Sequence, residues 1–436
     1  MVDAAVIKIW GELVGAVRWD TSKQLASFQY EKNFLSKGYN LSPIKMPIKN
    51  GDRIYSFPEL RKGKEEQTAT FKGLPGLLAD SLPDKYGNQL INVWLAQNGR
   101  PPDSMNPVEQ LCFIGSRGMG ALEFEPTQLK SGKRTFALEI KSLVEVAQKM
   151  LSKREDFKVN LNEDEQKAMI EILKIGTSAG GVRPKAVIAF NIKTREVRSG
   201  QTIAPKGFEH WLLKLDGVSD VQFGLSHGFG RVEYAYYLMA KDCKVQMMDC
   251  ELLEENGRAH FMTKRFDREG NSTKHHIQTF CGIRHFDYNN LHGFSYEQLF
   301  QTMRTLRMTY PEAEQMFRRM VFNVMATNYD DHTKNFSFRL KQNGKWELSP
   351  AYDVCYSYDP KNIWVSQHSL SINGKHTRII KFDLMTIAST NNIKKGEGII
   401  EEIKETVCNW SKYADQVKVS AELKGSITKT LVALKF

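Results

Sequence analysis

The stretch Asn328–Phe338 reads N-Y-D-D-H-T-K-N-F-S-F, and the interpretation of the whole chain depends on it. The residues before it, from Glu312 to about Thr327, carry apolar side chains at helical spacing and predict a helix. The residues after it alternate as a strand does. A dense group of Asp, His, Lys and Asn between a helix and a strand is typical of a loop. Within it, Asp330 and Asn335 stand five positions apart.

This spacing matches the protein-kinase catalytic loop, in which an Asp accepts a hydroxyl proton and an Asn holds a metal ion. A second carboxylate should follow on a nearby strand to hold the nucleotide's metal, and Asp353 is placed to do so. Asp331 is an alternative base, although the spacing to Asn335 favours Asp330. The competing interpretation is a solvated, charged loop, because a D-x4-N match alone is not specific.

Length and composition limit the classes of protein to consider. At 436 residues the chain is long enough for two or three structural units. The net charge of +11 favours anionic partners such as nucleotides, nucleic acid or acidic proteins, although many basic proteins bind no polymer. The six cysteines form no C-x-x-C pair, which argues against a zinc site or a disulfide framework. With no leader-like start and no membrane-spanning apolar run, we expect a soluble cytoplasmic protein.

The first third of the chain predicts a small sheet-rich unit followed by helices. Residues 2–60 alternate as short strands, with a hairpin around Gly11-Glu12. Residues 74–98 have helical periodicity. The glycine-rich run Gly115–Gly120 precedes another strand, and a tight turn is favoured there over a phosphate-binding loop.

Two further helices are predicted at 137–152 and 161–175, and a second glycine-rich loop follows at Gly176–Lys185. Small residues let backbone N–H groups approach a phosphate, and Lys185 would add positive charge. The loop is not a Walker motif, because Lys185 is followed by Ala and a strand. It lies where a kinase has the loop that covers its nucleotide. A plain flexible loop is the alternative.

Lys214 lies inside the apolar strand predicted at 210–215, where a lysine is costly to bury without a partner. Nucleotide phosphates would supply that partner. Glu233, in the first turn of the next predicted helix, would then form the Lys–Glu ion pair of kinases. Alternatively, Lys214 extends to solvent from an edge strand and Glu233 is only a favourable helix N-terminal charge.

The last predicted strand before the helical half of the chain is 259–266, the place where a kinase has the hinge that contacts adenine. Helical periodicity then returns at 295–308, 312–327 and about 380–436. His275-His276 supplies two adjacent ligand types without a third, which is insufficient for a metal site.

Taken together, these motifs resemble the HipA family of bacterial serine/threonine kinases, the toxins of type II toxin–antitoxin modules. The resemblance extends over nearly the whole chain and implies an α+β, two-lobed protein-kinase-like fold. It implies a small N-terminal β-rich subdomain (1–130), a nucleotide-binding region (131–268) and a mostly helical C-terminal lobe (269–436). The motifs that carry it are S-A-G-G-V-R-P-K at 178–185, L-K-L at 213–215, E-Y at 233–234, K-R-F-D-R at 264–268 and the N-Y-D-D-H-T-K-N-F-S stretch at 328–337.

The resemblance also implies roles for individual residues. Asp330 would be the catalytic base, and Asn335 and Asp353 would hold Mg²⁺. Lys214, His332 and Lys334 would take part in catalysis. The residues expected to bind ATP are Ala179, Gly180, Gly181, Val182, Arg183, Lys185, Lys214, Lys264, Arg265, Phe266, His332, Asn335 and Asp353. Lys264 departs from the family, in which an acidic residue is common, so hinge contacts would run through the backbone.

Regulation and partners are likewise implied by the resemblance. Ser178 would be autophosphorylated, with Thr177 as a second acceptor, and a phosphate there would repel a loop meant to meet ATP phosphates. The expected partners are a HipB-like helix-turn-helix antitoxin, operator DNA through that complex, and a protein substrate such as an aminoacyl-tRNA synthetase. One alternative is a catalytically weak co-repressor. Another is a small-molecule kinase, against which the N-terminal sheet unit and the Ser178 loop argue.

Overall fold

The computed structural model describes residues 2–61, 70–128, 139–152, 173, 176, 184–200, 203–218, 228–270 and 272–436. The chain forms two compact units. The first, the sheet unit, comprises 1–42, 46–230 and 250–277. The second, the helical unit, comprises 43–45, 231–249 and 278–436. Among the described residues, every helix is too short or too polar to cross a membrane.

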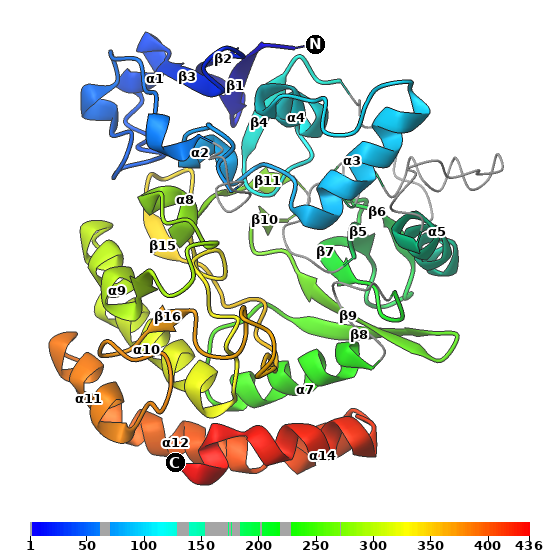
Figure 1. The fold of residues 1–436 in the computed structure, drawn as a ribbon, viewed down its shortest axis with the longest axis vertical. Helices are drawn as coiled ribbons and strands as arrows, with labels where there is room; N and C mark the ends of the chain where they lie inside the picture. Colours follow the sequence, from blue (N-terminus) through cyan, green and yellow to red (C-terminus); the bar gives the residue numbers. More distant parts are fainter. Residues whose placement is uncertain are drawn as a thin grey trace. The chain divides into compact units, whose positions relative to one another are not determined.

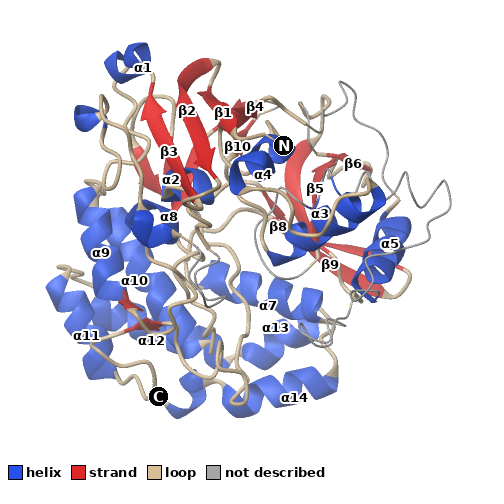
Figure 2. Cartoon of the chain, turned by 45° about the horizontal axis from the view of Figure 1, so that its top comes forward, coloured by secondary structure: helices blue, strands red, loops and turns tan. Residues whose placement is uncertain are grey.

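The sheet unit opens with a four-stranded antiparallel sheet in the order β3-β2-β1-β4 (Figure 2). The predicted hairpin is confirmed, with its turn one residue earlier at Trp10-Gly11. Both turn residues have positive φ, 51° and 81°, as a two-residue turn that matches strand twist requires. Helix α4 (Pro107–Ile114) packs on this sheet and is capped by the Asn106 side chain. The strands are β1 (Ala4–Ile9), β2 (Glu12–Asp20), β3 (Leu25–Tyr30) and β4 (Leu122–Glu125).

A second sheet in this unit has five antiparallel strands in the order β6-β5-β7-β9-β8 (Figure 1). Its apolar side chains share one core with helices α3 (Lys85–Gln97) and α5 (Ile140–Ser152). The strands predicted at 186–192, 210–215 and 259–266 are confirmed to within two residues. The strands are β5 (Lys185–Phe190), β6 (Val197–Ser199), β7 (Glu209–Lys214), β8 (Cys250–Glu255) and β9 (Arg258–Lys264).

Short elements complete the sheet unit, and the last of them continues into the helical unit. They are α1 (Lys32–Ser36), η1 (Ile48–Asn50), η2 (Pro58–Leu60), α2 (Gly76–Ala79), β10 (Arg268–Glu269), β11 (Thr273–Lys274) and β12 (His276–Thr279).

The helical unit is built around α10 (Tyr310–Met325), which packs against α11 (Lys381–Thr390) and α12 (Gly396–Cys408) (Figure 1). Pro311 stands in its first turn, and Glu312 accepts a hydrogen bond from the Thr309 N–H at 2.7 Å, as a capping box requires. The other elements are α7 (Phe229–Asp242), α8 (Phe280–Arg284), β13 (Phe294–Ser295), α9 (Tyr296–Thr305), β14 (Ser337–Leu340), β15 (Trp346–Leu348), β16 (Leu370–Ser371), α13 (Trp410–Gln416), α14 (Ala421–Thr430) and η4 (Val432–Lys435).

Candidate active site

The loop between α10 and β14 is held by backbone hydrogen bonds at both ends. The Asn328 N–H bonds to the Asn323 carbonyl of α10, and the Tyr329 N–H bonds to the Ser357 carbonyl at 3.0 Å. Further along, the Thr333 carbonyl accepts from the Cys281 N–H of α8. We call residues 328–335 the catalytic loop. Because its backbone is anchored on three separate segments, the loop has a defined conformation without a regular secondary structure.

Asp330 presents its carboxylate outward, with 44% of its side chain exposed. His332 Nε2 lies 3.5 Å from Asp330 Oδ1. The other ring nitrogen, Nδ1, accepts a hydrogen bond from the Lys334 N–H at 3.2 Å, so the imidazole proton of the neutral ring belongs on Nε2. The His332 ring therefore lies beside the Asp330 carboxylate, with Nε2 as the nitrogen nearest to it.

Asp331 has the opposite environment, because its side chain is fully buried. Its Oδ2 accepts from the Tyr296 hydroxyl at 2.9 Å and from His368 Nδ1 at 2.8 Å, and its Oδ1 accepts from the Ser369 N–H at 2.7 Å. With both oxygens bound by donors inside the protein, this carboxylate is poorly placed to take a proton from a substrate hydroxyl. Of the two adjacent carboxylates, this geometry favours Asp330 as the base.

Asn335 and Asp353, the two predicted metal ligands, line the same pocket. The Asn335 amide donates from Nδ2 to the Asp330 carbonyl at 2.6 Å, which leaves its Oδ1 as the atom that can face a cation. Asp353 has a left-handed backbone conformation with φ of 52°, which is uncommon for a residue other than glycine and is found at functional sites. An amide oxygen and a carboxylate are hard donors that suit Mg²⁺.

The same pocket is lined by further residues of the helical unit. Among its polar lining residues, Arg319 is buried and donates to the Ser349 carbonyl, and burial lowers the pKa of Arg319 to about 10. Its lining residues are Val245, Arg319, Phe322, Asn323, Asn328, Asp331, Asn335, Phe336, Ala351, Tyr352, Asp353 and Val354. Within the part of the chain that is described, no group of three or more His, Cys, Asp or Glu forms a metal cluster. A kinase-type site would rest on Asn335 and Asp353 instead.

Two aromatic residues position Lys334 and were not anticipated from the sequence. The Lys334 ammonium lies 4.9 Å from the centre of the Tyr288 ring, and Tyr288 also packs against the His332 ring. The Tyr352 hydroxyl donates to the Lys334 carbonyl at 2.7 Å, which ties the loop to the residue before Asp353. Tyr288 is far from the loop in sequence and Tyr352 lies in an irregular segment, so no local pattern indicates either of them.

In the sheet unit, two predicted phosphate-binding lysines meet. Lys185 on β5 lies directly opposite Lys214 on β7, so both side chains are on the same face of the sheet. Lys185 is buried, and the Lys214 ammonium lies 5.6 Å from the centre of the Phe261 ring. Like charges directly opposite each other repel, and an anion at this face would relieve that repulsion.

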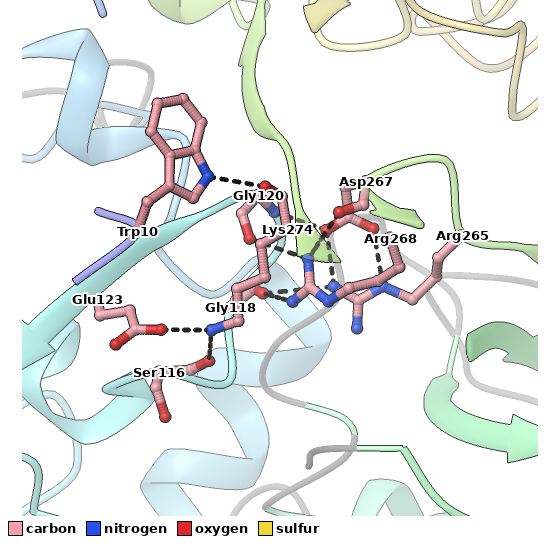
Figure 3. A network of polar contacts seen from close by, with 9 residues as sticks. All are labelled: Trp10, Ser116, Gly118, Gly120, Glu123, Arg265, Asp267, Arg268 and Lys274. Carbon is pink, nitrogen blue, oxygen red and sulfur yellow. Dashed lines mark hydrogen bonds and ion pairs between the residues drawn. The ribbon is translucent and has the colours of Figure 1, made fainter. Parts of the chain in front are cut away.

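The predicted hinge residues Lys264, Arg265 and Phe266 are described at the end of β9, and the two cations there are already engaged. Lys264 pairs with Glu209, and the Arg265 guanidinium contacts the Asp267 carboxylate at 2.7 Å and 2.9 Å (Figure 3). Phe266 is largely buried. A nucleotide contact by the Arg265 side chain would require breaking a buried ion pair, so the hinge contacts predicted here would have to use the backbone.

Asp267 is the centre of the network in Figure 3. Its carboxylate is fully buried and also accepts from Arg268 at 2.7 Å and from the Gly120 N–H at 2.7 Å. Burial alone would raise the pKa of Asp267, but the charges of Arg265 and Arg268 outweigh it and hold that pKa far below its ordinary value. The two guanidinium groups thus keep the Asp267 carboxylate ionised despite its burial.

The same network explains the glycine-rich run Gly115–Gly120. Its carbonyls face cations: Gly118 and Gly120 accept from Arg268, and Ser116 accepts from Lys274 (Figure 3). A phosphate-binding loop would offer its N–H groups to a ligand, but here those of Gly115, Arg117 and Gly120 already donate to the Leu111 carbonyl, the Ile114 carbonyl and the Asp267 carboxylate. The structure therefore agrees with a turn here, as favoured from the sequence.

Several sequence predictions lie elsewhere. Thr177, Ser178, Ala179, Gly180, Gly181, Val182 and Arg183 fall outside the described residues. Lys214 belongs to the sheet unit and Glu233 to the helical unit, so their ion pair stays a prediction. His275 and His276 do not act together, because His275 Nε2 contacts Glu269 and His276 Nε2 contacts the Leu41 carbonyl.

Comparisons with known proteins agree with this architecture. A structure titled "Shewanella oneidensis MR-1 Toxin Antitoxin System HipA, HipB and its operator DNA complex" matches with a TM-score of 0.69 and 18% identity, over 98% of this chain and 96% of that one. The α+β, two-lobed kinase-like fold expected from the sequence is confirmed. The Helicobacter pylori proinflammatory kinase CtkA matches with a TM-score of only 0.33 and 12% identity, over 59% of this chain and 94% of that one.

No curated protein matches the chain in a sequence search. Two family models do match. The HipA N-terminal domain covers residues 5–125, and the HipA-like C-terminal domain covers residues 177–411, which is more than half of the chain. The chain therefore belongs to the HipA family.

Proposed function

We propose that the chain is the toxin of a type II toxin–antitoxin module and a protein serine/threonine kinase that uses ATP and Mg²⁺. The observation that carries the proposal is the catalytic loop itself. Asp330 is outward and half-exposed, while Asn335 and Asp353 line one pocket beside it. Membership of the HipA family supports the same assignment.

In the reaction we propose, the serine or threonine oxygen bonds to the γ-phosphorus. The bond between the γ-phosphorus and the β–γ bridging oxygen breaks, and ADP leaves with that oxygen. Asp330 accepts the hydroxyl proton, and the His332 Nε2–H restrains its carboxylate. Asn335 and Asp353 are the residues that would hold Mg²⁺, which would supply positive charge to offset that of the nucleotide phosphates.

The lysines have electrostatic roles in this proposal. Lys185 and Lys214 would attract the nucleotide phosphates, because their side chains share one face of the five-stranded sheet. Lys334, held against Tyr288, would stabilise charge that develops on the transferred group. The loop from Gly180 to Lys185 would cover the ATP phosphates, with Ala179 also in contact, and Ser178 would be the regulatory autophosphorylation site. Mass spectrometry of a Ser178→Ala variant should show most self-incorporated phosphate gone.

The partners in this proposal follow from the family and from the similar solved structure. That structure contains HipA, HipB and operator DNA, so we propose a HipB-like antitoxin and DNA binding through the complex. The substrate would be a translation-related protein such as an aminoacyl-tRNA synthetase, in the cytoplasm. The division at residues 130 and 268 stays a prediction.

The proposal is tested by incubating purified protein, freed of prior phosphate, with radiolabelled ATP and Mg²⁺, alone and with a cell lysate. Label on a discrete lysate protein, absent with Asp330→Asn, is the expected result. Calorimetry should show weaker Mg²⁺-ATP binding by Asp353→Asn. Absence of label from all proteins, with a folded wild type, would contradict kinase activity.

A co-repressor role is a second candidate, favoured by the net charge of +11 and by the operator DNA in the similar complex. A DNA mobility shift that requires the antitoxin and weakens steeply with salt would support it, whether or not the chain is a kinase.

A further inference from the structure

Asp331 is a buried carboxylate for which the proposed reaction has no use. Burying a charge is costly unless hydrogen bonds compensate for it, and three donors surround this one. They come from α9, through Tyr296, and from the segment after Asp353, through His368 and Ser369. Asp331 therefore joins the catalytic loop to two elements that are 35 or more residues away in sequence.

The hydrogen bonds that reach Asp331 form a directed chain. Asn328 Nδ2 donates to Asn323 Oδ1, Asn323 Nδ2 donates to the Tyr296 hydroxyl, and that hydroxyl donates to Asp331. Burial, and then the charge of Asp331, raise the pKa of Tyr296 well above its ordinary value, so the hydroxyl keeps its proton. Each donor in the chain is oriented toward the carboxylate, and such chains strengthen one another.

The segment 357–369 is attached to the catalytic loop at further points. Ser357 exchanges backbone hydrogen bonds with Thr327 and Tyr329, and the Ser369 hydroxyl donates to the Tyr329 carbonyl at 3.3 Å. The His368 ring packs on the Tyr329 ring at 4.3 Å between centroids. If the segment separated from the loop, Asp331 would lose two of its three donors inside the protein.

We infer that Asp331 is a positioning residue that holds Asp330 outward and couples the catalytic loop to segment 357–369 through His368 and Ser369. The inference rests on the proposed kinase function. Asp330 and Asp331 are adjacent in the chain, so fixing the Asp331 side chain inside the protein limits the conformations open to Asp330, whose side chain is 44% exposed. The Asn335 bond to the Asp330 carbonyl fixes the same residue from its other side.

The test compares Asp331→Asn with a matched control, Asp383→Asn. Asp383 is also a buried carboxylate of the helical unit with three donors, from Asn373, Lys375 and the Ile380 N–H. At a temperature where circular dichroism shows both variants fully folded, we expect kcat of Asp331→Asn to fall by about 10²-fold, with KM for ATP nearly unchanged. Asp383→Asn should keep the wild-type kcat.

A second pair of variants separates positioning from general damage to the fold. His368→Ala removes the donor to Asp331 and should lower kcat as Asp331→Asn does. His368→Asn places an amide N–H near the position of Nδ1 and should restore most of kcat. Wild-type kcat in folded Asp331→Asn, a loss confined to KM, or an equal loss in Asp383→Asn would each overturn the inference.

Limited trypsin digestion tests whether segment 357–369 is attached to the catalytic loop, and this test does not depend on kinase activity. Lys361 is exposed within the segment, and cleavage there should be faster in Asp331→Asn than in wild type and Asp383→Asn. An unchanged cleavage rate would refute the coupling. If wild type transfers no phosphate at all, the proposed function and the positioning role both fail. Faster cleavage of Asp331→Asn would still support the attachment of segment 357–369 to the catalytic loop through Asp331.

Discussion

Two of the buried carboxylates in the part of the chain that the structure describes are compensated in different ways. Asp267, in the sheet unit, is surrounded by the guanidinium groups of Arg265 and Arg268 and one backbone N–H. Asp331, in the helical unit, is bound by a phenol, an imidazole and a backbone N–H. The first carboxylate is matched by positive charge, and the second depends on hydrogen-bond geometry.

This difference indicates that the two carboxylates have different structural roles. Removing one partner from a buried ion-pair cluster leaves an uncompensated charge and therefore lowers the free energy of unfolding strongly. The Asp267 cluster thus suits a permanent connection between the Gly115–Gly120 turn and the end of β9. Asp331 is held by polar donors from helix α9 and from residues 368 and 369, and breaking such hydrogen bonds costs less. A lower cost of release would suit a carboxylate next to Asp330, the base that we propose.

The largest effect should come from Asp267→Asn, which leaves Arg265 and Arg268 buried beside a neutral amide. We expect the free energy of unfolding to fall by roughly 3–5 kcal/mol, measured by urea denaturation monitored by circular dichroism. A loss below 1 kcal/mol would mean that water or a rearranged partner compensates the arginines, and the distinction between the two carboxylates would fail.

Acid should weaken the sheet unit through His276 rather than through Asp267. Burial lowers the pKa of His276 from 6.5 to about 4, so its contribution is complete above pH 6.5 and is lost as the pH falls toward 4. The expected loss is about 3 kcal/mol. Asp267 stays charged throughout this range. His276→Gln, which can still donate to the Leu41 carbonyl, should flatten the pH dependence of unfolding; an unchanged slope would exclude His276 as a source.

Asp331→Asn should lower the free energy of unfolding by less than Asp267→Asn, about 1–3 kcal/mol, because the donors it leaves behind are a phenol, an imidazole and a backbone N–H rather than two guanidinium groups. The same urea experiment measures it. Equal losses in the two variants would show that charge compensation does not distinguish the two sites.

Lys274→Met should have the smallest effect. Lys274 bonds to Glu123 at 2.6 Å and to the Ser116 carbonyl at 2.9 Å at the rim of the Asp267 network, and Glu123 can be hydrated when the lysine is lost. We expect a loss of about 0.5–1.5 kcal/mol by chemical denaturation. A cost as large as that of Asp267→Asn would make the whole network one cooperative unit.

Much of the fold was predictable because its signals are local. The helix before the catalytic loop was expected from Glu312 and is found at Tyr310–Met325, since its apolar periodicity and capping residues are contained in the segment. The hairpin at Trp10-Gly11 and the strands of the five-stranded sheet follow from alternation and turn chemistry in the same way.

The candidate site was predictable only in part. Asp330, Asn335 and Asp353 carry a spacing that indicates chemistry, and the structure brings the last two to one pocket. The roles of Asp331 and Arg265 depend on tertiary partners. Tyr296 and His368 are distant in sequence from Asp331, and whether Arg265 faces a nucleotide or Asp267 depends on the turn after β9. No local pattern encodes such choices.

The most direct test of the central claim is the initial rate of phosphate transfer from ATP by wild type, Asp330→Asn and Asp331→Asn under identical conditions. We predict that Asp330→Asn unfolds like wild type yet loses at least about 10²-fold in rate, because the exposed base is gone while the buried anchor is kept. A wild-type rate for Asp330→Asn, with activity lost only in Asp331→Asn, would contradict the account and assign the base to the buried carboxylate.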